Sequence, residues 1–391
     1  MRQYYADLHV HVGRAQGRPV KITASEKLTV ESILDTCAGD KGLDIVGIVD
    51  CGSPPVLQDI KELLSQGKLE DTGYGFLRSE RGVNLVLGIE TESREGAHFI
   101  SYMPDLEALD LWHKTMNRKL TNPNLSTQRS QAGAVELLDK TLALDGIFVV
   151  AHAFTPHKGA YGCWVERLQN GFGNKAMMIH ALELGLSSDT DMAGLIQETS
   201  GFAFLSNSDA HSGPNIGREY NQLRMASASF KELLMAMQNR EGRRITANYG
   251  MHPHLGKYHR SHCPRCNIIT SNSHPIFACE VCGQEMVAGV WDRIISIKDN
   301  DESHQPIGRP SYNYRVPPSF IPGLGPKTYT KLRRAIGSEI EIYERAGLDL
   351  IEKVAGAGIA GYIGAMRQNR LTFVPGGGGR YGRVKKDNHN I

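Results

Sequence analysis

The residues of this sequence best suited to chemistry are histidines and carboxylates at the ends of hydrophobic runs. The first run ends in His9-Val10-His11, and residues two apart in a β-strand point to the same face, so these imidazoles should lie side by side. Paired imidazoles suit divalent metal ions near neutral pH. Later runs end in further candidate donors: Asp50, Glu90, His98, His152, Asp209 and His211. This set would serve two or three metal ions, and it favours a metal-dependent hydrolase over a scaffold protein.

The alternative is a collection of unrelated core or surface histidines. A lone histidine would favour that interpretation. Here His9 pairs with His11, Asp209 pairs with His211, and Glu90 directly follows the apolar run 85–89. Pairs at several strand ends favour a metal site, with Glu90 and Asp209 as the expected catalytic carboxylates.

Strands must bring these donors together, and strand-like runs alternate with helical stretches over residues 1–250. The strand candidates are 6–12, 45–49, 85–89, 98–102, 147–151, 181–184, 203–206 and 245–248. The alternation predicts an α/β fold with a largely parallel sheet. Because the candidate ligands follow many strands, we expect a barrel with its active site at the strand C-terminal ends.

Four of the seven cysteines form a second candidate metal site. They make two C-x-x-C pairs, Cys263 with Cys266 and Cys279 with Cys282. Four thiolates suit a tetrahedral zinc ion and leave no open position for a substrate, so this site is expected to be structural. The alternative, two disulfides, needs an oxidising compartment, whereas the cysteine pattern favours a reducing cytoplasm.

A short glycine-containing pattern occurs twice near the C-terminus. Segments 321–327 and 354–360 share the order apolar-x-Gly-apolar-Gly, and helical stretches follow at 328–336 and 361–366. Such a turn brings backbone N–H groups up to an anion, which in a helix-hairpin-helix is a DNA phosphate. The expected DNA-binding residues are Gly323, Gly325, Lys327, Lys331, Arg333, Arg334, Gly356 and Gly358. The alternative is two ordinary glycine-rich helix caps.

The loop after His152 carries aromatic residues and a cation that could stack on a nucleobase and position it. Its candidate base-pocket residues are Phe154, Lys158, Tyr161 and Trp164. Ordinary loop packing explains the same residues equally well.

The distribution of charge and the change of composition along the chain indicate a possible partner and the division into parts. The 44 basic and 42 acidic residues nearly balance, but from residue 323 onwards there are 12 Lys/Arg against 6 Asp/Glu, a surplus that suits nucleic acid. No signal peptide or membrane-spanning run is seen, so we expect a cytoplasmic monomer without membrane contact. The expected parts are a barrel at 1–250, a zinc-binding module at 251–310, a helical module at 311–374 and a flexible Gly/Arg/Lys tail at 375–391.

The donor pattern resembles the polymerase-and-histidinol-phosphatase (PHP) family over about residues 1–250. The resemblance implies a distorted (β/α)7 barrel that cleaves phosphate esters with two or three ions of zinc, manganese or magnesium. It implies that His9 and His11 hold one metal, that Glu90 bridges two, and that His98, His152, Asp209 and His211 complete the set. Two departures concern the third metal: Asp50-Cys51 stands where the family has Asp-His, and no acid follows His11 closely. Asp50 and Cys51 are therefore less certain ligands.

The order of parts resembles the endonuclease Q family over nearly the whole chain. This implies an endonuclease that nicks DNA on the 5′ side of deaminated bases (uracil, hypoxanthine, xanthine) or abasic sites. The residues alone indicate a metal-dependent phosphodiesterase acting on DNA. Two alternatives stay open: a PHP-type phosphoesterase for a small phosphorylated metabolite, and a DNA-binding protein whose barrel has lost its chemistry.

Overall fold

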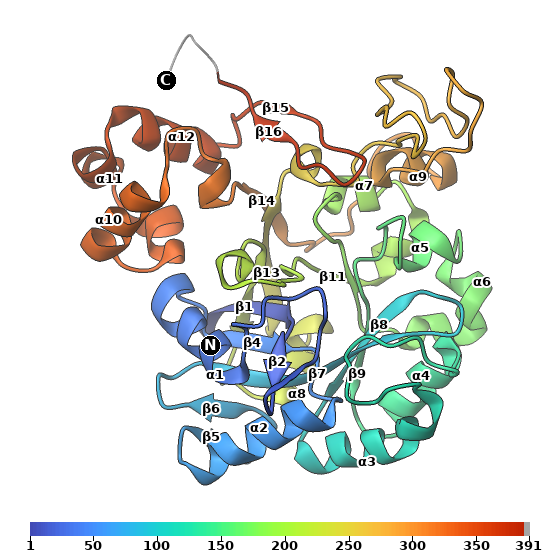
Figure 1. Ribbon diagram of the computed structural model, residues 1–391, viewed down its shortest axis with the longest axis vertical. Coiled ribbons are helices and arrows are strands. Elements are labelled where there is room, and N and C mark those ends of the chain that lie inside the picture. The colour runs from blue at the N-terminus through green and yellow to red at the C-terminus, as the bar shows by residue number, and fades with distance from the viewer. Residues whose placement is uncertain (387–391) are drawn as a thin grey trace.

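The computed structural model describes residues 1–386, and a curled mixed sheet forms its centre (Figure 1). The strands follow the order β11-β10-β9-β8-β7-β4-β1-β12-β13-β14. Their bounds are β1 (Arg2–Val10), β4 (Ile45–Ile48), β7 (Asn84–Glu92), β8 (His98–Met103), β9 (Ile147–Val150), β10 (Ala181–Glu183), β11 (Ala203–Leu205), β12 (Tyr220–Met225), β13 (Arg244–Met251) and β14 (Ser311–Arg315). The short strands are β2 (Arg14–Ala15), β3 (Arg18–Pro19), β5 (Leu69–Asp71), β6 (Leu77–Ser79), β15 (Phe373–Val374) and β16 (Arg383–Val384).

Helices pack around this sheet and form most of the upper left part of the molecule in Figure 1. The α-helices are α1 (Val30–Asp35), α2 (Pro54–Ser65), α3 (Leu106–Met116), α4 (Ala134–Leu142), α5 (Ala160–Cys163), α6 (Leu168–Phe172), α7 (Thr190–Ala193), α8 (Phe230–Met237), α9 (Val290–Ile297), α10 (Pro326–Ile336), α11 (Leu348–Ala355) and α12 (Ala357–Arg367). Side-chain caps mark several starts, since Thr29, Asp105 and Ser229 each accept a hydrogen bond from the first turn of α1, α3 and α8.

The sheet is less parallel than the sequence pattern predicts. β1, β4 and β7 run parallel, as do β9, β10 and β11, but β8 is antiparallel to both of its neighbours. Only residues 93–97 connect β7 to β8, and a parallel pair needs a crossover of a dozen residues or more. β12 is absent from the strands that the sequence pattern predicts, because its Asn, Gln and Arg residues interrupt the apolar pattern.

Asparagine side chains join β11 to β12 and β13, where the sheet curls towards closure. Asn221 Oδ1 accepts a hydrogen bond from Ser206 N, and Asn221 Nδ2 donates to Ser206 O, both at 2.9 Å. Asn248 Nδ2 donates to Phe204 O at 2.9 Å. Because all of these groups are buried, their amides supply hydrogen bonds that a strand ladder would otherwise make.

Two apolar clusters cover the faces of the sheet. Along β1, Ala6 and Leu8 belong to the cluster that includes α8, whereas Tyr5 belongs to the larger cluster with α1 to α4. This alternation follows from the two-residue period of a strand. Val10 breaks this alternation: it has the parity of Ala6 and Leu8 but belongs to the larger cluster, because the pairing of β1 with β4 shifts register between Asp7 and Val10.

Parts of the C-terminal half pack against the barrel. Val290 and Ile294 of α9 join the larger core cluster, and β14 pairs with β13. The expected boundaries assigned these segments to the zinc-binding and helical modules. The helices α10, α11 and α12 have their own apolar cluster around Leu332, Ile351 and Ile363.

The expected flexible tail is ordered as far as the structure describes it; residues 387–391 of that prediction lie outside the described residues. β15 and β16 pair as a hairpin, Gly376 N donates to His254 O, and Gly382 N donates to Leu255 O. A Cβ on Gly376 or Gly382 would come within 2.5 Å of backbone atoms, so glycine here permits tight packing rather than flexibility. Among the described residues, no helix is long and apolar enough to cross a membrane.

Candidate active site

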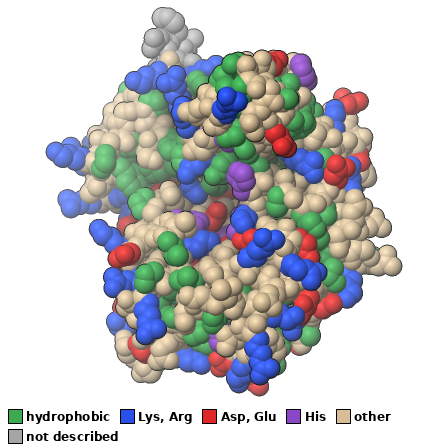
Figure 2. Space-filling model, turned by 45° about the vertical axis from the view of Figure 1, so that its right-hand side comes forward, with side chains coloured by type: hydrophobic (Ala, Val, Ile, Leu, Met, Phe, Trp, Pro, Cys, Tyr) green, Lys and Arg blue, Asp and Glu red, His purple; other side chains and the backbone are tan. Residues whose placement is uncertain are grey.

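The histidine and carboxylate donors converge at one end of the barrel. β1, β7 and the segments after β9 and β11 carry His9, Glu90, His152 and Asp209 to this end, and His98 starts the antiparallel β8 beside them. His9 and His11 are fully buried, and Glu90 is 4% exposed. Figure 2 shows histidine side chains near the middle of one face of the molecule, next to both cationic and acidic groups.

His9, His11, Glu90 and Asp209 form the densest part of the site. The two Nε2 atoms lie 3.2 Å apart. Asp209 Oδ1 lies 3.5 Å from His9 Nε2 and 3.3 Å from His11 Nε2. Glu90 Oε1 lies 3.6 Å from His9 Nε2, and Oε2 lies 3.4 Å from His11 Nε2. These donors point to a common centre, as ligands of one ion would.

Glu90 also faces a second group of donors. Its Oε1 lies 2.9 Å from His98 Nδ1 and 3.3 Å from His152 Nε2. Glu90 can therefore bridge two ions, one on each side. A third group, His11 with Asp209 and His211, also has its donor atoms within 4.8 Å of one another.

Two further carboxylates, Glu183 and Asp50, orient the rings of His9 and His11. Glu183 Oε2 lies 2.9 Å from His9 Nδ1, and Asp50 Oδ1 lies 2.9 Å from His11 Nδ1. A carboxylate on the far nitrogen fixes the ring and leaves Nε2 for a metal. Asp50 therefore acts through His11 instead of serving as a ligand in this arrangement. Sequence reasoning missed Glu183, although its place at the end of β10 was a signal.

Cys51 does not lie with the donors. Its Sγ donates to Ile48 O at 3.1 Å, and the side chain belongs to the larger apolar core. Burial raises the pKa of the thiol, so it stays protonated and is a poor ligand. Cys51 is a packed residue in this structure.

The chemistry of the donor set fits divalent ions. Burial would lower the pKa of His9, but the carboxylates of Glu183 and Asp209 raise it to about 10, so this pocket strongly favours positive charge. Buried nitrogens His98 Nε2 and His152 Nδ1 have no hydrogen-bond partner among the described residues. His152 and Asp209 also have positive φ values of 28° and 45°. Such backbone strain is typical of functional sites.

The predicted base-pocket residues are mostly core residues. Phe154 and Tyr161 are fully buried and stack on each other at 5.1 Å, and Tyr161 Oη donates to Glu198. Trp164 packs edge-on against Phe99 and Phe172. Phe154 and Tyr161 thus belong to the core, and Trp164 packs against it while partly buried. Of the four, only Lys158 borders the site, where it pairs with Glu92 at 2.6 Å.

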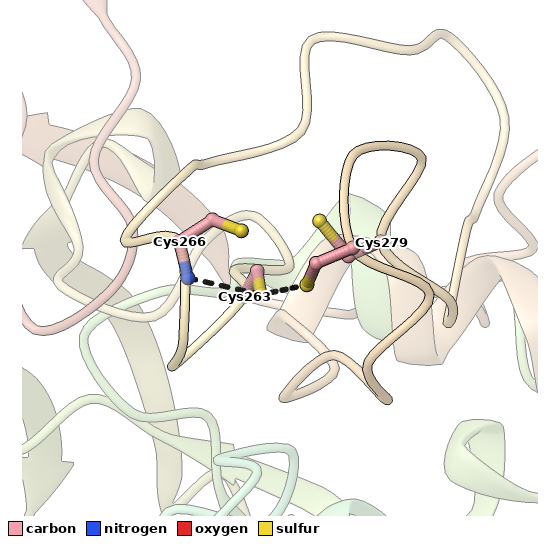
Figure 3. A group of neighbouring side chains, drawn as sticks. Cys263, Cys266 and Cys279 are labelled. Atoms are coloured by element: carbon pink, nitrogen blue, oxygen red, sulfur yellow. Dashed lines mark hydrogen bonds between the residues drawn. The ribbon is translucent and has the colours of Figure 1, made fainter.

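The four cysteines form a compact cluster on two loops (Figure 3). Cys263 Sγ and Cys282 Sγ lie 3.6 Å apart, close to the ~3.8 Å expected for tetrahedral thiolates with bonds of about 2.3 Å to zinc. All four are free rather than disulfide-bonded. Backbone N–H groups of Val281 and Cys282 lower the pKa of the Cys279 thiol to about 7, which favours the thiolate that a metal needs.

Most of the predicted DNA-binding residues are exposed on the surface of the helical module, in the two glycine turns and on α10. Gly323, Gly325, Lys327, Lys331, Arg334, Gly356 and Gly358 are exposed. Arg333 differs from this prediction, because its guanidinium binds Gly39 O at 2.9 Å and Asp40 Oδ1 at 2.7 Å. Arg333 therefore fastens α10 to the barrel and is not free to bind DNA.

Comparison with known proteins decides the family. No family model matches the sequence. An uncharacterized protein of Bacillus subtilis, YqxK, is 38% identical over 98% of this chain and all of its own length. The crystal structure of the lesion-specific endonuclease PfuEndoQ from Pyrococcus furiosus is 30% identical and superposes with a TM-score of 0.85, covering 98% of this chain and 95% of that one. The chain belongs to the endonuclease Q family.

A second endonuclease Q structure agrees over the full length. It is 30% identical, has a TM-score of 0.86, and covers 100% of this chain and 99% of that one. It contains a 27-mer duplex substrate with an abasic lesion at the active site. The expected family and the order of barrel, four-cysteine cluster and helical module are thereby confirmed.

Proposed function

We propose that this chain is a metal-dependent DNA endonuclease that nicks the phosphodiester 5′ to deaminated bases or abasic sites. The observation that carries the proposal is Glu90, which faces two groups of metal donors in a chain related to endonuclease Q over its whole length. The abasic lesion in the related complex supports the abasic substrate. The deaminated bases uracil, hypoxanthine and xanthine rest on the family resemblance.

The barrel residues would hold two ions about Glu90, one with His9, His11 and Asp209 and one with His98 and His152. When bound, such ions lower the pKa of a water and neutralise charge on phosphate oxygens. Asp209 has a 30% exposed side chain, whereas the His9 and His11 side chains are fully buried, so Asp209 faces the side from which substrate and water arrive. Its carboxylate would orient the attacking water.

His211 stands beside Asp209 as a neutral imidazole. Burial and the charge of His11 lower the pKa of His211 to about 4. The ring therefore remains uncharged near neutral pH and can offer the lone pair of a nitrogen to a metal. Asp209 O, 2.9 Å from His211 Nδ1, holds the ring so that Nε2 is left available.

The helical module would hold the DNA backbone through its two glycine turns. Gly323 and Gly356 have φ values of 83° and 93°, which L-residues rarely adopt. Gly325 and Gly358 lack this reason to be glycine, and a Cβ on either would meet nothing within 4 Å. An outside partner that approaches the backbone closely explains them, and helices α10 and α12 start there with no side-chain cap. A DNA phosphate suits such N-terminal N–H groups.

A nicking assay tests the proposal. Duplexes with uracil, hypoxanthine, an abasic site or no lesion are incubated with the zinc-loaded full chain and Mn²⁺, Mg²⁺ or Zn²⁺, and products are sized on a denaturing gel. We expect one nick 5′ to each lesion and none in the normal duplex. Asp209→Asn should abolish cleavage and leave DNA binding largely intact, whereas Asp301→Asn, at an exposed carboxylate, should behave as wild type.

The same assay separates the alternatives. Hydrolysis of a small phosphate ester without any nick would favour a metabolite phosphoesterase. Tight, salt-sensitive DNA binding without cleavage under all three metals would favour a non-catalytic DNA-binding protein.

A further inference from the structure

Lys21 places a buried ammonium group inside the cluster of metal donors. Its side chain is 13% exposed, and Nζ lies 3.2 Å from Glu90 Oε2 and 2.6 Å from Thr127 Oγ1. Its backbone N–H donates to Val12 O, next to His11.

The loop at 120–130 is shaped to close on the same carboxylates. Thr127 has a φ of 52°, which is unusual for a β-branched residue and costs free energy. In this conformation Thr127 Oγ1 donates to Glu90 Oε2 at 2.7 Å, while Ser126 Oγ donates to Asp50 Oδ1. The strained backbone of Thr127 therefore places its hydroxyl so that Glu90 Oε2 is held between this hydroxyl and the Lys21 ammonium.

The donors beside Lys21 suffice for two ions but not for a third. His11 and Asp209 are needed for the first ion, so the third group, which they form with His211, adds only His211 as a donor of its own. Segment 13–16 (Gly-Arg-Ala-Gln) carries no acid, and Cys51 points into the core. Asp50 is already bound by His11, Val12 N and Ser126.

We propose that the Lys21 ammonium takes the place of a third metal ion, so that the barrel binds two divalent ions, and that it contacts a non-bridging oxygen of the scissile phosphate. An ammonium has three N–H donors. Two point to Glu90 and Thr127, and the third has no partner among the described residues. It is left for the substrate, where a fixed positive charge stabilises the charge that develops on the phosphate. This inference rests on the proposed nuclease function.

Counting bound ions tests the replacement without DNA. The full chain, with zinc at its cysteines, is freed of barrel metal by dialysis against a weak chelator and titrated with Mn²⁺. Zinc and manganese are then counted by mass spectrometry. We expect one zinc and two manganese ions per chain, and three manganese ions would overturn the proposal.

Lys21→Ala tests the role of the charge, with Lys68→Ala as the matched control, because Lys68 forms an exposed pair with Glu31 at 2.6 Å. Lys21→Ala should bind Mn²⁺ three- to tenfold more tightly, since a repelling cation is gone, yet nick 10²- to 10³-fold more slowly with unchanged DNA affinity. A residue with only a structural role would weaken Mn²⁺ binding instead. Lys21→Arg should recover part of the rate.

The outcomes distinguish the two proposals. A wild-type chain that binds two Mn²⁺ but nicks no lesion would contradict the nuclease function and leave the metal count standing. Weaker Mn²⁺ binding or an undiminished nicking rate in Lys21→Ala would overturn the role of Lys21, even if the wild type nicks as expected.

Discussion

At the scale of single residues, the site depends on side chains that hold the candidate metal donors in place. Glu183 is fully buried, and one of its oxygens lies 2.9 Å from His9 Nδ1, while the other has no partner among the described residues. Asn207 Nδ2 donates to the bonded oxygen at 3.1 Å. His9 is thus held by a carboxylate that is itself held, as in many metal sites with histidine ligands.

Glu183→Gln should weaken divalent-metal binding by the barrel about 10- to 100-fold, because His9 loses the carboxylate that fixes its ring. The measurement is a Mn²⁺ titration of the full chain, followed by the nicking rate at saturating Mn²⁺. Glu198→Gln is the control, since that carboxylate accepts a hydrogen bond from Tyr161 away from the site. Equal metal affinities in the two variants would contradict the role given to Glu183.

Glu219 makes stability depend on pH. Burial raises the pKa of Glu219 from 4.5 to about 8, so the folded chain favours its neutral form. The unfolded chain loses this proton near pH 4.5 and the folded chain only near pH 8. The stabilising effect of the proton is therefore complete below pH 4.5 and lost as pH rises to 8, by on the order of 4 kcal/mol.

Glu219→Gln should remove this dependence, so the variant gains stability relative to wild type at pH 8 but not at pH 5. Urea unfolding at both pH values, with barrel metal removed, measures the difference. A constant difference between the two proteins across this range would show that Glu219 does not titrate as inferred.

At the scale of elements, strand ends made the ligand set predictable. His9, His11, Glu90, His98, His152, Asp209 and His211 stand in short local patterns, and the barrel brings such positions together. The partners that support them were not predictable, because the contacts of His9 with Glu183 and of Lys21 with Thr127 join residues 174 and 106 positions apart. The predicted base pocket in the loop after His152 was ambiguous from sequence. Aromatic residues there suit both stacking on a base and packing in a core.

The two glycine turns give a prediction at this scale. Gly358→Ala should stabilise α12 by about 0.5–1 kcal/mol, because a helical alanine loses less backbone freedom on folding than glycine. It should also weaken duplex binding several-fold, since the added methyl group stands where a phosphate approaches. Thermal unfolding and fluorescence anisotropy measure the two effects. Gly201→Ala, also at an open glycine, should leave DNA affinity unchanged.

At the scale of the whole molecule, charged pairs fasten the helical module to the barrel. Lys41 Nζ lies 2.7 Å from Glu339 Oε2, and both side chains are only 5% exposed. The same ammonium donates to Pro214 O at 2.9 Å, three residues after His211. A second charged contact joins α10 to the barrel, where Arg333 binds Asp40. The module that would hold DNA is therefore tied directly to the segment that follows the metal donors.

Lys41→Ala should destabilise the chain by about 3–5 kcal/mol, because Glu339 is left as a buried charge without its cation. Lys61→Ala removes an exposed partner of Asp110 and should cost less than about 1 kcal/mol. Urea unfolding measures both values. Similar losses in the two variants would show that the barrel and the helical module are not held by this pair.

Arg218 and Tyr381 carry a consequence for how the protein is made. Arg218 Nε donates to Ser208 O beside Asp209, and Arg218 Nη1 donates to Tyr381 Oη at 2.8 Å across 163 residues of sequence. In a chain still on the ribosome, Arg218 can therefore reach Ser208 O but lacks the hydrogen bond to Tyr381 that holds its guanidinium in place. The barrel should therefore reach its full metal affinity only after residue 381 has emerged.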